Sequence, residues 1–423
     1  MPMPVQAGMK KPEPYPCLST RLLRSVTPDL VKIPKGVNIM DYKTKIIHTG
    51  KDRDPYTGAS SIPIYQVSTF AQDDPVKLGP YDYGRVINPT RDALEHTVAL
   101  LESGSQGYAF ASGMAAISSV LLLFQPGDHI IVAEDVYGGT YRVLTTIFKR
   151  WGLKHTFVDM TDPQKISEAI KPETKAIFAE TPSNPLLKIT DLAAVAKIAK
   201  KSGLLTIIDN TFMSPYLQRP IEFGFDIVIH SATKFLGGHS DLIAGIAVTR
   251  EVQLGNKLKD IQNGFGGILG PQDSWLVLRG IKTLAPRMET QQKNAETIAI
   301  WLSKHPLVKH VYYPTLAWHP GREIHLKQAS GGGAVVSFEL ENGEIAKKVL
   351  RNVKIPLMAV SLGGVESILS YPTTMSHAAM PEKKRHAQGI TDGVVRLSVG
   401  LEDPEDLCDD LKQAMENSIH SSP

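Results

Sequence analysis

Residues 105–250 alternate short apolar runs with helical segments, and this alternation constrains the possible fold more than any other feature of the chain. The runs are GYAFAS, HIIVAE, HTFVD, AIFAE, LLTIID, DIVIHS and IAGIAVT. They do not alternate polar with apolar residues, so we expect strands that are covered on both faces. The pattern predicts a mostly parallel sheet flanked by helices, in an α/β fold.

The helical segments carry start and stop signals. In TDLAAVAKIAKKSG, Thr190 or Asp191 can cap the start of a helix, and Gly203 can end it. A long helical stretch is predicted near residues 272–304. After it, GGGAVVSFEL, a polar helix, GVVRLSVGLE and the capped helix DPEDLCDDLKQAM predict a smaller C-terminal α+β domain.

The composition excludes several kinds of partner. With 423 residues, of which 42% are hydrophobic, the chain can bury the cores of two or more domains. The formal net charge is only +3, so we expect neither nucleic acid nor a membrane surface as a partner. No apolar run approaches the roughly 20 residues that a membrane span needs. Cys17 and Cys408 lie at opposite ends of the chain and form no CxxC motif, which fits a reducing, cytoplasmic compartment.

The first 40 or so residues differ from the rest of the chain. The segments MPMPV, KKPEPYP and VKIPKG contain prolines that disfavour regular structure, so we expect a flexible arm. A targeting leader is an alternative, because Lys10, Lys11, Arg21 and Arg24 face few acids, and Met40 is an alternative start of the protein.

Several predicted strands end on polar residues, at the edge of the sheet where α/β proteins bind ligands. In FASGMAAIS, Ser112 and Gly113 lie at a strand-to-helix turn, where backbone N–H groups and the helix dipole can hold an anion. LLTIIDN ends on Asp209, and DIVIHSATK ends on Ser231, Thr233 and Lys234. Each motif alone has another interpretation: tight packing, a turn carboxylate or a solvated lysine.

Together these groups match one ligand, pyridoxal 5'-phosphate. Its phosphate suits the helix end, its ring nitrogen suits Asp209, and its aldehyde suits Lys234. Tyr137 in EDVYGGTY can stack on the ring, and Asn184 in ETPSNP can bind the ring hydroxyl. A packed tyrosine and an Asn-Pro turn are the respective alternatives.

Histidines also flank the lysine, but they do not indicate a metal site. His230 and His239 match no spacing of helical ligand pairs, and no cysteine or carboxylate cluster accompanies them. We therefore expect no metal.

Eight ordered motifs resemble those of the pyridoxal-phosphate enzymes of cysteine and methionine metabolism, the trans-sulfuration enzymes. They are YGRVINPT, FASGMAAI, EDVYGGTYR, ETPSNP, DNTF, HSATKFLGGHSD, SLGGVESILSYPTTMSH and VVRLSVGLED, and they cover roughly residues 45–418. The resemblance implies the pyridoxal-phosphate-dependent transferase fold of type I, a small sulfur amino acid as substrate, and a homotetramer built as a dimer of dimers.

The resemblance also implies a division of the chain. Residues 1–44 would form the arm, 45–95 a segment that contacts the neighbouring subunit, 96–290 the cofactor-binding domain, and 291–423 the C-terminal domain.

Matched to the motifs of the family, Lys234 resembles the Schiff-base lysine that also moves protons, and Asp209 the partner of the ring nitrogen. Tyr137 corresponds to the stacking ring and Asn184 to the contact with the ring oxygen. The implied phosphate contacts within the subunit are Gly113, Met114, Ser231 and Thr233.

The resemblance further assigns residues to the substrate and to the neighbouring subunit. Tyr83 and Arg85 match a pair that reaches the neighbour's phosphate, and Tyr83 is expected to take the proton of the substrate amine. Arg396, assisted by Ser361, matches the arginine that binds the substrate α-carboxylate. Arg396 also indicates an anion by itself, because a cation within the apolar strand VVRLSV needs a partner.

Within the family, Val360 is the most informative residue about the reaction. Members that carry out γ chemistry on cystathionine commonly have glutamate before the serine of SLGG, where it can meet the distal ammonium of the substrate. Methionine γ-lyases have a cysteine where this chain has Gly139. The block AVSLGGVESILSYPTTMSHAAMP most resembles cystathionine β-lyases of the Bacillus type. We therefore expect β-elimination on L-cystathionine, with γ-lyase or γ-synthase activity as the alternative and methionine γ-lyase activity as a less favoured one.

Overall fold

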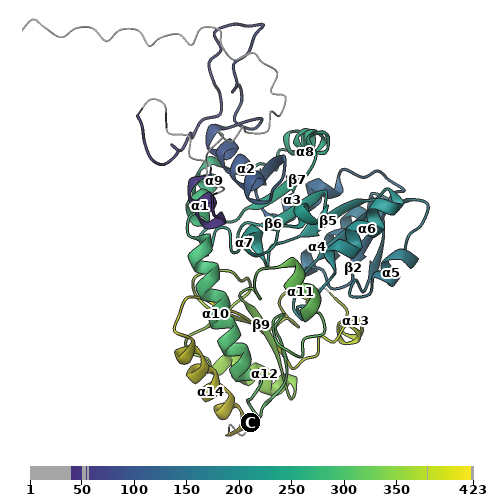
Figure 1. The fold of residues 1–423 in the computed structure, drawn as a ribbon, viewed down its shortest axis with the longest axis vertical. Helices are drawn as coiled ribbons and strands as arrows, with labels where there is room; N and C mark the ends of the chain where they lie inside the picture. The colour runs from purple at the N-terminus through teal and green to yellow at the C-terminus, as the bar shows by residue number, and fades with distance from the viewer. Residues whose placement is uncertain (1–39, 50–53, 55–56, 379, 421–423) are drawn as a thin grey trace, which may run out of the picture. The chain divides into compact units, whose positions relative to one another are not determined.

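The runs predicted as strands between residues 105 and 250 form one sheet of seven strands in a computed structural model of the chain (Figure 1). The strands are β1 Gln106–Phe110, β2 His129–Ala133, β3 Lys154–Val158, β4 Thr174–Glu180, β5 Leu205–Asp209, β6 Ile227–Ser231 and β7 Gly245–Thr249. Their order is β1-β7-β6-β5-β4-β2-β3, and only β7 runs antiparallel to its neighbours. The structure describes residues 40–49, 54, 57–378 and 380–420. The mostly parallel α/β sheet is therefore confirmed.

Helices flank this sheet and connect its parallel strands. They are α1 Tyr42–His48, α2 Pro89–Leu101, α3 Gly113–Leu121, α4 Gly138–Val143 continued by the π-helix η1 Leu144–Phe148, α5 Pro163–Glu168, α6 Leu192–Ser202, α7 Ser214–Leu217, the 3-10 helix η2 Pro220–Phe223 and α8 Val252–Phe265. Of the two candidate caps of α6, Asp191 is the one used, since its side chain accepts the Ala194 N–H at 3.0 Å. Gly203 ends the helix in the left-handed region, with φ of 66°. The predicted start and stop are thus confirmed.

The helical stretch predicted near residues 272–304 is interrupted. It consists of α9 Pro271–Ile281 and α10 Leu284–Leu302. Side chains bind the carbonyl groups at the end of α9: Arg287 Nη2 donates to Gly280 O at 2.9 Å, and the Thr283 hydroxyl donates to the same oxygen at 3.1 Å. Both bonds satisfy the Gly280 carbonyl group at the point where the helix stops.

A second sheet of five strands follows, in the order β10-β11-β12-β9-β8. Its elements are β8 Val308–Tyr312, α11 Arg322–Gln328, β9 Val335–Leu340, α12 Gly343–Asn352, β10 Leu357–Met358, β11 Ile368–Ser370, α13 Glu382–Ala387, β12 Val394–Ser398 and α14 Pro404–His420. The predicted strands β9 and β12 and helices α12 and α14 are present, whereas β8, β10 and β11 were not predicted.

Helix α10 joins the two hydrophobic cores (Figure 1). Leu284 and Met288, in its first half, belong to the core of the seven-stranded sheet, and Ile298 and Leu302 belong to the core of the second sheet. The predicted domain boundary at 290/291 falls within this helix, and the division of the chain stays a proposal.

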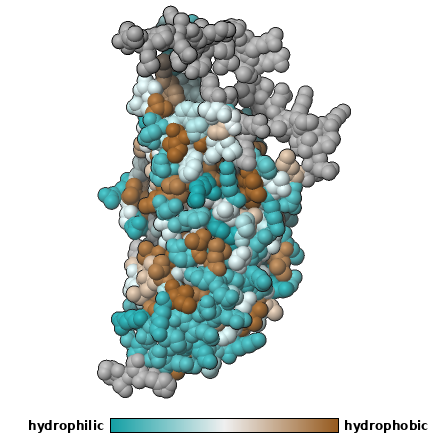
Figure 2. All heavy atoms as spheres, turned by 90° about the vertical axis from the view of Figure 1, so that its left-hand side faces the viewer, coloured by the Kyte–Doolittle hydropathy of each residue, from teal (hydrophilic) through white to brown (hydrophobic). Residues whose placement is uncertain are grey.

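The outer surface mixes both kinds of side chain, and on the face seen in Figure 2 apolar groups are separated by hydrophilic ones. None of the described helices is long and apolar enough to cross a membrane. The predicted arm lies mostly outside the described residues, and residues 42–44 belong to α1.

Beneath the strand ends, the carboxylate of Glu102 and the imidazole of His230 form a buried pair. Glu102 follows α2, and its Oε1 lies 2.6 Å from Nε2 of His230 on β6. The same oxygen accepts a hydrogen bond from Asn210 Nδ2 at 2.9 Å. The exposed fractions of Glu102 and His230 are 0% and 1%, so water cannot replace these bonds. Glu102 therefore ties α2 to the ends of β5 and β6.

We predict that Glu102→Ala lowers the free energy of unfolding by roughly 3 kcal/mol, because buried donors left without partners cost about 1–3 kcal/mol each. The unfolding temperature should fall by several degrees. Glu341→Ala, at an exposed position, is the matched control and should change little. Equal unfolding temperatures for the two variants would contradict the role given to the buried pair.

Candidate active site

The polar residues predicted at the strand ends surround one cavity of about 460 Å³. The cavity lies beyond the carboxyl ends of β4, β5 and β6, against the first turns of α3 and α4. The predicted residues that line it are Gly113, Met114, Tyr137, Asn184, Asp209, Ser231, Thr233, Lys234, Val360, Ser361 and Arg396. Tyr83 and Arg85 do not line it. Predicted residues that lie as far apart in the chain as Gly113 and Arg396 thus meet at one cavity.

Lys234 extends into the cavity from the turn after β6. Its backbone N–H donates to Ser231 O at 3.1 Å, and its Nζ donates to the hydroxyl of Ser361. Burial, followed by the positive charge of Arg396, lowers the pKa of Lys234 to about 8. At pH 7 about a tenth of this amine is uncharged. An uncharged amine is both a nucleophile and a base.

Arg396 lies on β12 with 3% of its surface exposed. Its Nη1 donates to Asn184 Oδ1 at 3.0 Å, and its Nη2 donates to Ser361 O at 2.6 Å and to Ser370 Oγ at 3.1 Å. Burial lowers the pKa of Arg396 to about 10, so the side chain is still charged at neutral pH. Within the described ranges no carboxylate forms an ion pair with it, and its Nε has no partner. A buried cation held only by neutral groups can accept an anionic ligand.

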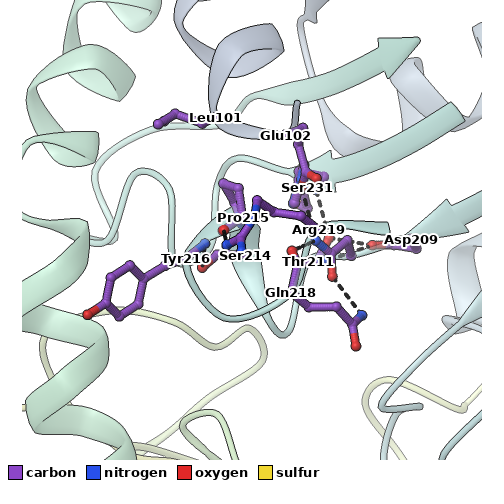
Figure 3. Close-up of polar contacts among 12 residues, drawn as sticks. Leu101, Glu102, Asp209, Thr211, Ser214, Pro215, Tyr216, Gln218, Arg219 and Ser231 are labelled. Carbon is purple, nitrogen blue, oxygen red and sulfur yellow. Dashed lines mark hydrogen bonds and ion pairs between the residues drawn. The ribbon is translucent and has the colours of Figure 1, made fainter. Parts of the chain in front are cut away.

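Asp209 at the end of β5 is held by one neighbour. The Thr211 N–H donates to Asp209 Oδ1 at 3.0 Å, the Thr211 hydroxyl donates to the same oxygen, and this hydroxyl accepts the Ser231 N–H at 2.8 Å (Figure 3). Burial raises the pKa of Asp209 above its ordinary value, and the bonds from Thr211 and the charge of His230 oppose that shift. Oδ2 has no partner among the residues that the structure describes, so one oxygen is left for a ligand.

The start of α3 provides donors for an anion. The Ser112 side chain caps the helix by accepting the Ala115 N–H at 3.1 Å. The N–H groups of Gly113 and Met114 have no acceptor in the described part of the chain, and they lie at the positive end of a nine-residue helix. This arrangement suits a phosphate group.

Ser231, the last residue of β6, approaches the helix start closely. A Cβ at Gly113 would lie 3.0 Å from Ser231 Cβ, so glycine permits this approach. The hydroxyl of Thr233 accepts the Ala244 N–H at 3.0 Å and lies 3.3 Å from Ala244 O. Ser231 and Thr233 therefore line the cavity beside the helix end, although the Thr233 hydroxyl already has backbone partners.

Tyr137 and Asn184 form another part of the cavity wall. A Cβ at Gly139 would overlap the Tyr137 ring and lie 2.7 Å from the Met114 sulfur, so glycine leaves room for that ring. Asn184 accepts a bond from Arg396 through Oδ1. This leaves its amide Nδ2 as a donor toward a ligand.

Tyr83 and Arg85 lie elsewhere on the chain. The Arg85 Nη1 atom donates to the side chain of Asn263 at 2.6 Å, and its guanidinium lies 5.7 Å from the centre of the Tyr83 ring. Tyr83 is 45% exposed. Their predicted role at a neighbouring subunit stays a proposal.

The histidines beside Lys234 bind separate protein groups. His230 contacts Glu102, and His239 Nδ1 lies 2.8 Å from Gly237 O. The expectation of no metal stays a prediction.

Sequence reasoning missed four polar residues of the cavity: Glu180, Thr211, Arg142 and Ser376. Glu180 ends β4 just as Asp209 ends β5, so the strand-end signal that identified Asp209 applied equally to Glu180. Thr211 follows Asp209 by two residues, the spacing of a common side-chain turn.

This set of groups fits pyridoxal 5'-phosphate. The helix end suits its phosphate, the free oxygen of Asp209 its ring nitrogen, and the uncharged amine of Lys234 its aldehyde. A Cβ at Gly113 would crowd Ser231 and one at Gly139 would overlap the Tyr137 ring, so glycine at both positions allows the cavity wall to pack closely.

Comparisons with known proteins agree with this fit. A family model described as Cys/Met metabolism PLP-dependent enzyme matches residues 43–416. The chain is 56% identical to cystathionine beta-lyase MetC of Bacillus subtilis, over 88% of this chain and 96% of that protein. It is 53% identical to cystathionine gamma-lyase of Bacillus subtilis, over 89% of this chain and 100% of that protein. The crystal structure of cystathionine gamma-lyase from Lactobacillus plantarum complexed with L-serine superposes with a TM-score of 0.88 at 48% identity, covering 89% of this chain and 99% of that one.

The family match extends over both sheets, and the cavity contains the groups that the cofactor of this family requires. The chain therefore belongs to the Cys/Met metabolism PLP-dependent enzymes and is a carbon–sulfur lyase that uses pyridoxal phosphate.

Proposed function

We propose that the enzyme carries out β-elimination on L-cystathionine and, with one water, yields homocysteine, pyruvate and ammonia. The observation that carries this choice is Val360, an apolar residue that lines the cavity and is 64% exposed. A glutamate there would favour γ chemistry. The β-lyase and γ-lyase relatives are 56% and 53% identical, so overall identity does not distinguish the two reactions.

Arg396 is proposed to bind the substrate α-carboxylate. Its guanidinium is fixed by Asn184, Ser361 and Ser370, so the donors are oriented before the substrate arrives. A carboxylate would supply the anion that the buried cation lacks. This contact directs the substrate Cα toward Lys234, which is bonded to the side chain of Ser361.

Lys234 is proposed to remove the proton from Cα and to return protons later in the cycle. The bound cofactor supplies an aldehyde that joins the substrate amine and a ring that accepts electrons from the bond being broken. Lys234 suits the proton transfer because its pKa of about 8 leaves part of the amine uncharged near neutral pH. The thiolate of homocysteine then leaves from Cβ.

The remaining groups are proposed to hold the cofactor. Asp209 would keep the ring nitrogen protonated, Tyr137 would stack on the ring, and Asn184 would bind the ring oxygen. The proposed phosphate contacts are Gly113, Met114, Ser231 and Thr233. The free N–H groups at the start of α3 support this assignment.

Tyr83 and Arg85 are proposed to complete the site of a neighbouring subunit in a homotetramer, arranged as a dimer of dimers. Their position outside the cavity of their own chain supports this assignment. Tyr83 would take the proton of the incoming substrate amine at the neighbour's site, and Arg85 would bind the neighbour's phosphate.

γ-Lyase or γ-synthase activity is the second candidate, and the γ-lyase relative supports it. Methionine γ-lyase activity is less favoured. A cysteine in place of Gly139 would require the Tyr137 ring to move, because a Cβ at that position overlaps the ring.

The product formed from L-cystathionine tests the proposed reaction. We expect pyruvate and homocysteine as the main products, identified by separating the keto acids. γ-Elimination would give 2-oxobutyrate and cysteine. A predominance of 2-oxobutyrate would reject the β-lyase proposal while leaving the cofactor assignment intact.

We predict that cofactor uptake by the apoenzyme accelerates as the pH rises through about 8 and then levels off, because the uncharged amine of Lys234 attacks the aldehyde and its pKa is lowered to about 8. From pH 7 to 8 the rate should rise about fivefold. The growth of visible absorbance after mixing measures it. Lys234→Ala should give no such band, and the exposed control Lys175→Ala should behave like wild type. A rate that keeps rising about tenfold per unit up to pH 10 would contradict the lowered pKa.

We predict that Val360→Glu increases 2-oxobutyrate relative to pyruvate. A charge-assisted bond to the distal ammonium of cystathionine, worth about 1.5–3 kcal/mol, would favour placement for γ chemistry. The product ratio should therefore change by roughly tenfold or more. Val360→Gln is the control of similar size without charge. A parallel loss of activity on all substrates, with an unchanged product ratio, would count against Val360 as a determinant of the reaction.

A further inference from the structure

Glu180 has a carboxyl group in the cavity, and the proposed function gives this group no role. It is the last residue of β4, and 6% of its surface is exposed. In the parallel register it pairs with Asp209 on β5. Neighbouring residues of paired strands lie about 4.8 Å apart and point to the same face, so the two carboxyl groups are close neighbours.

Glu180 contacts the backbone of residues that surround the proposed ring position. Its Oε2 accepts the Tyr137 N–H at 2.9 Å, and the backbone N–H of Asn184 also interacts with its carboxyl group. Tyr137 precedes α4, and no side chain of its own caps that helix. Glu180 therefore fixes the start of the helix from a separate strand, together with the segment that carries Asn184.

The charge around Glu180 is unusual for a buried carboxyl group. Among the described residues no lysine, arginine or histidine forms an ion pair with it, and its acidic neighbours are Asp209 and Asp135. Burial, followed by the charge of Asp209, raises the pKa of Glu180 well above its ordinary value. Two close buried carboxylates, of which only Asp209 is stabilised by a positive charge, that of His230, cannot both remain charged at low energy.

The surroundings decide which of the two carries the proton. Asp209 receives both hydrogen bonds of Thr211 on one oxygen, and the charge of His230 also favours its ionised form. A protonated ring nitrogen would stabilise the same charge. Glu180 also receives backbone N–H groups, from Tyr137 and Asn184, but no positive charge stabilises its ionised form, so the proton is assigned to Glu180.

We propose that Glu180 is a positioning residue that acts as a neutral acid, holding the Tyr137 and Asn184 backbones around the cofactor without placing a second negative charge beside Asp209. The inference rests on the cofactor contacts of the proposed function and is independent of the choice between β and γ chemistry.

Glu180→Gln and Glu180→Ala test the role in holding the backbone. An amide has the shape of a neutral carboxyl group and keeps an acceptor for the Tyr137 N–H, whereas alanine has none. Titration of each apoenzyme with pyridoxal phosphate, followed by visible absorbance, gives the Kd. We expect Gln to retain the Kd within about threefold and the pH profile of the absorbance, and Ala to weaken binding by about tenfold or more. Equal weakening in both variants, or none in either, would overturn the proposal.

Infrared spectroscopy of the holoenzyme tests the neutral state directly and does not depend on the folding of the alanine variant. A protonated carboxyl group has a C=O band distinct from that of a carboxylate. We expect wild type to show this band and Glu180→Gln to lack it. Glu134→Gln is the matched control, because Glu134 forms an ion pair with Lys188 at 3.3 Å, and it should leave the band unchanged. A wild-type spectrum without the band assigned to Glu180 would reject the neutral acid. If cystathionine gave no pyruvate but the band were present, only the proposed reaction would fail.

Discussion

The parallel pairing of β4, β5 and β6 is the constraint on which the rest of the site depends. It brings Glu180, Asp209 and Ser231 to the same edge of the sheet, although they lie far apart in the chain. Because the carboxyl ends of these three parallel strands lie at one edge of the sheet, side chains at and after the strand ends line one cavity. The buried pair of Glu102 and His230 supports this edge from beneath by tying it to the end of α2.

Charge balance explains the chemistry that this edge can support. Lys234 and Arg396 are buried cations in one cavity, and Asp209 and Glu180 are buried acids in the same cavity. Burial acts on all four in the same direction, toward the neutral form. Hydrogen bonds then distinguish the two acids, because those from Thr211 favour the charged form of Asp209. A site with one amine that readily loses its proton and one arginine that keeps its charge suits proton transfer on an amino acid.

The second sheet, with the loop between β10 and β11, contributes the residues proposed to bind the substrate. Val360, Ser361 and Arg396 all come from this region, whereas Lys234 and Asp209 come from the first sheet. Ser361 has a positive φ of 91°, a backbone conformation that is strained for residues other than glycine. The Ser361 carbonyl group accepts a hydrogen bond from Arg396 and its hydroxyl accepts one from Lys234, so this one residue connects the cation proposed to bind the substrate with the proposed base.

The sequence by itself determined the strands of the large sheet and the start and stop of α6, and it predicted most of the polar residues that line the cavity. These features are local, because strand periodicity, capping side chains and glycine stops act over a few residues. Only the tertiary structure decided that Glu180 lies beside Asp209 and that Arg396 is fixed by neutral groups from three separate segments. It also decided the break between α9 and α10, where Arg287 binds a carbonyl of the preceding helix. The physical reason is that burial and strand register bring together residues distant in the chain, and no local pattern records which charges become neighbours.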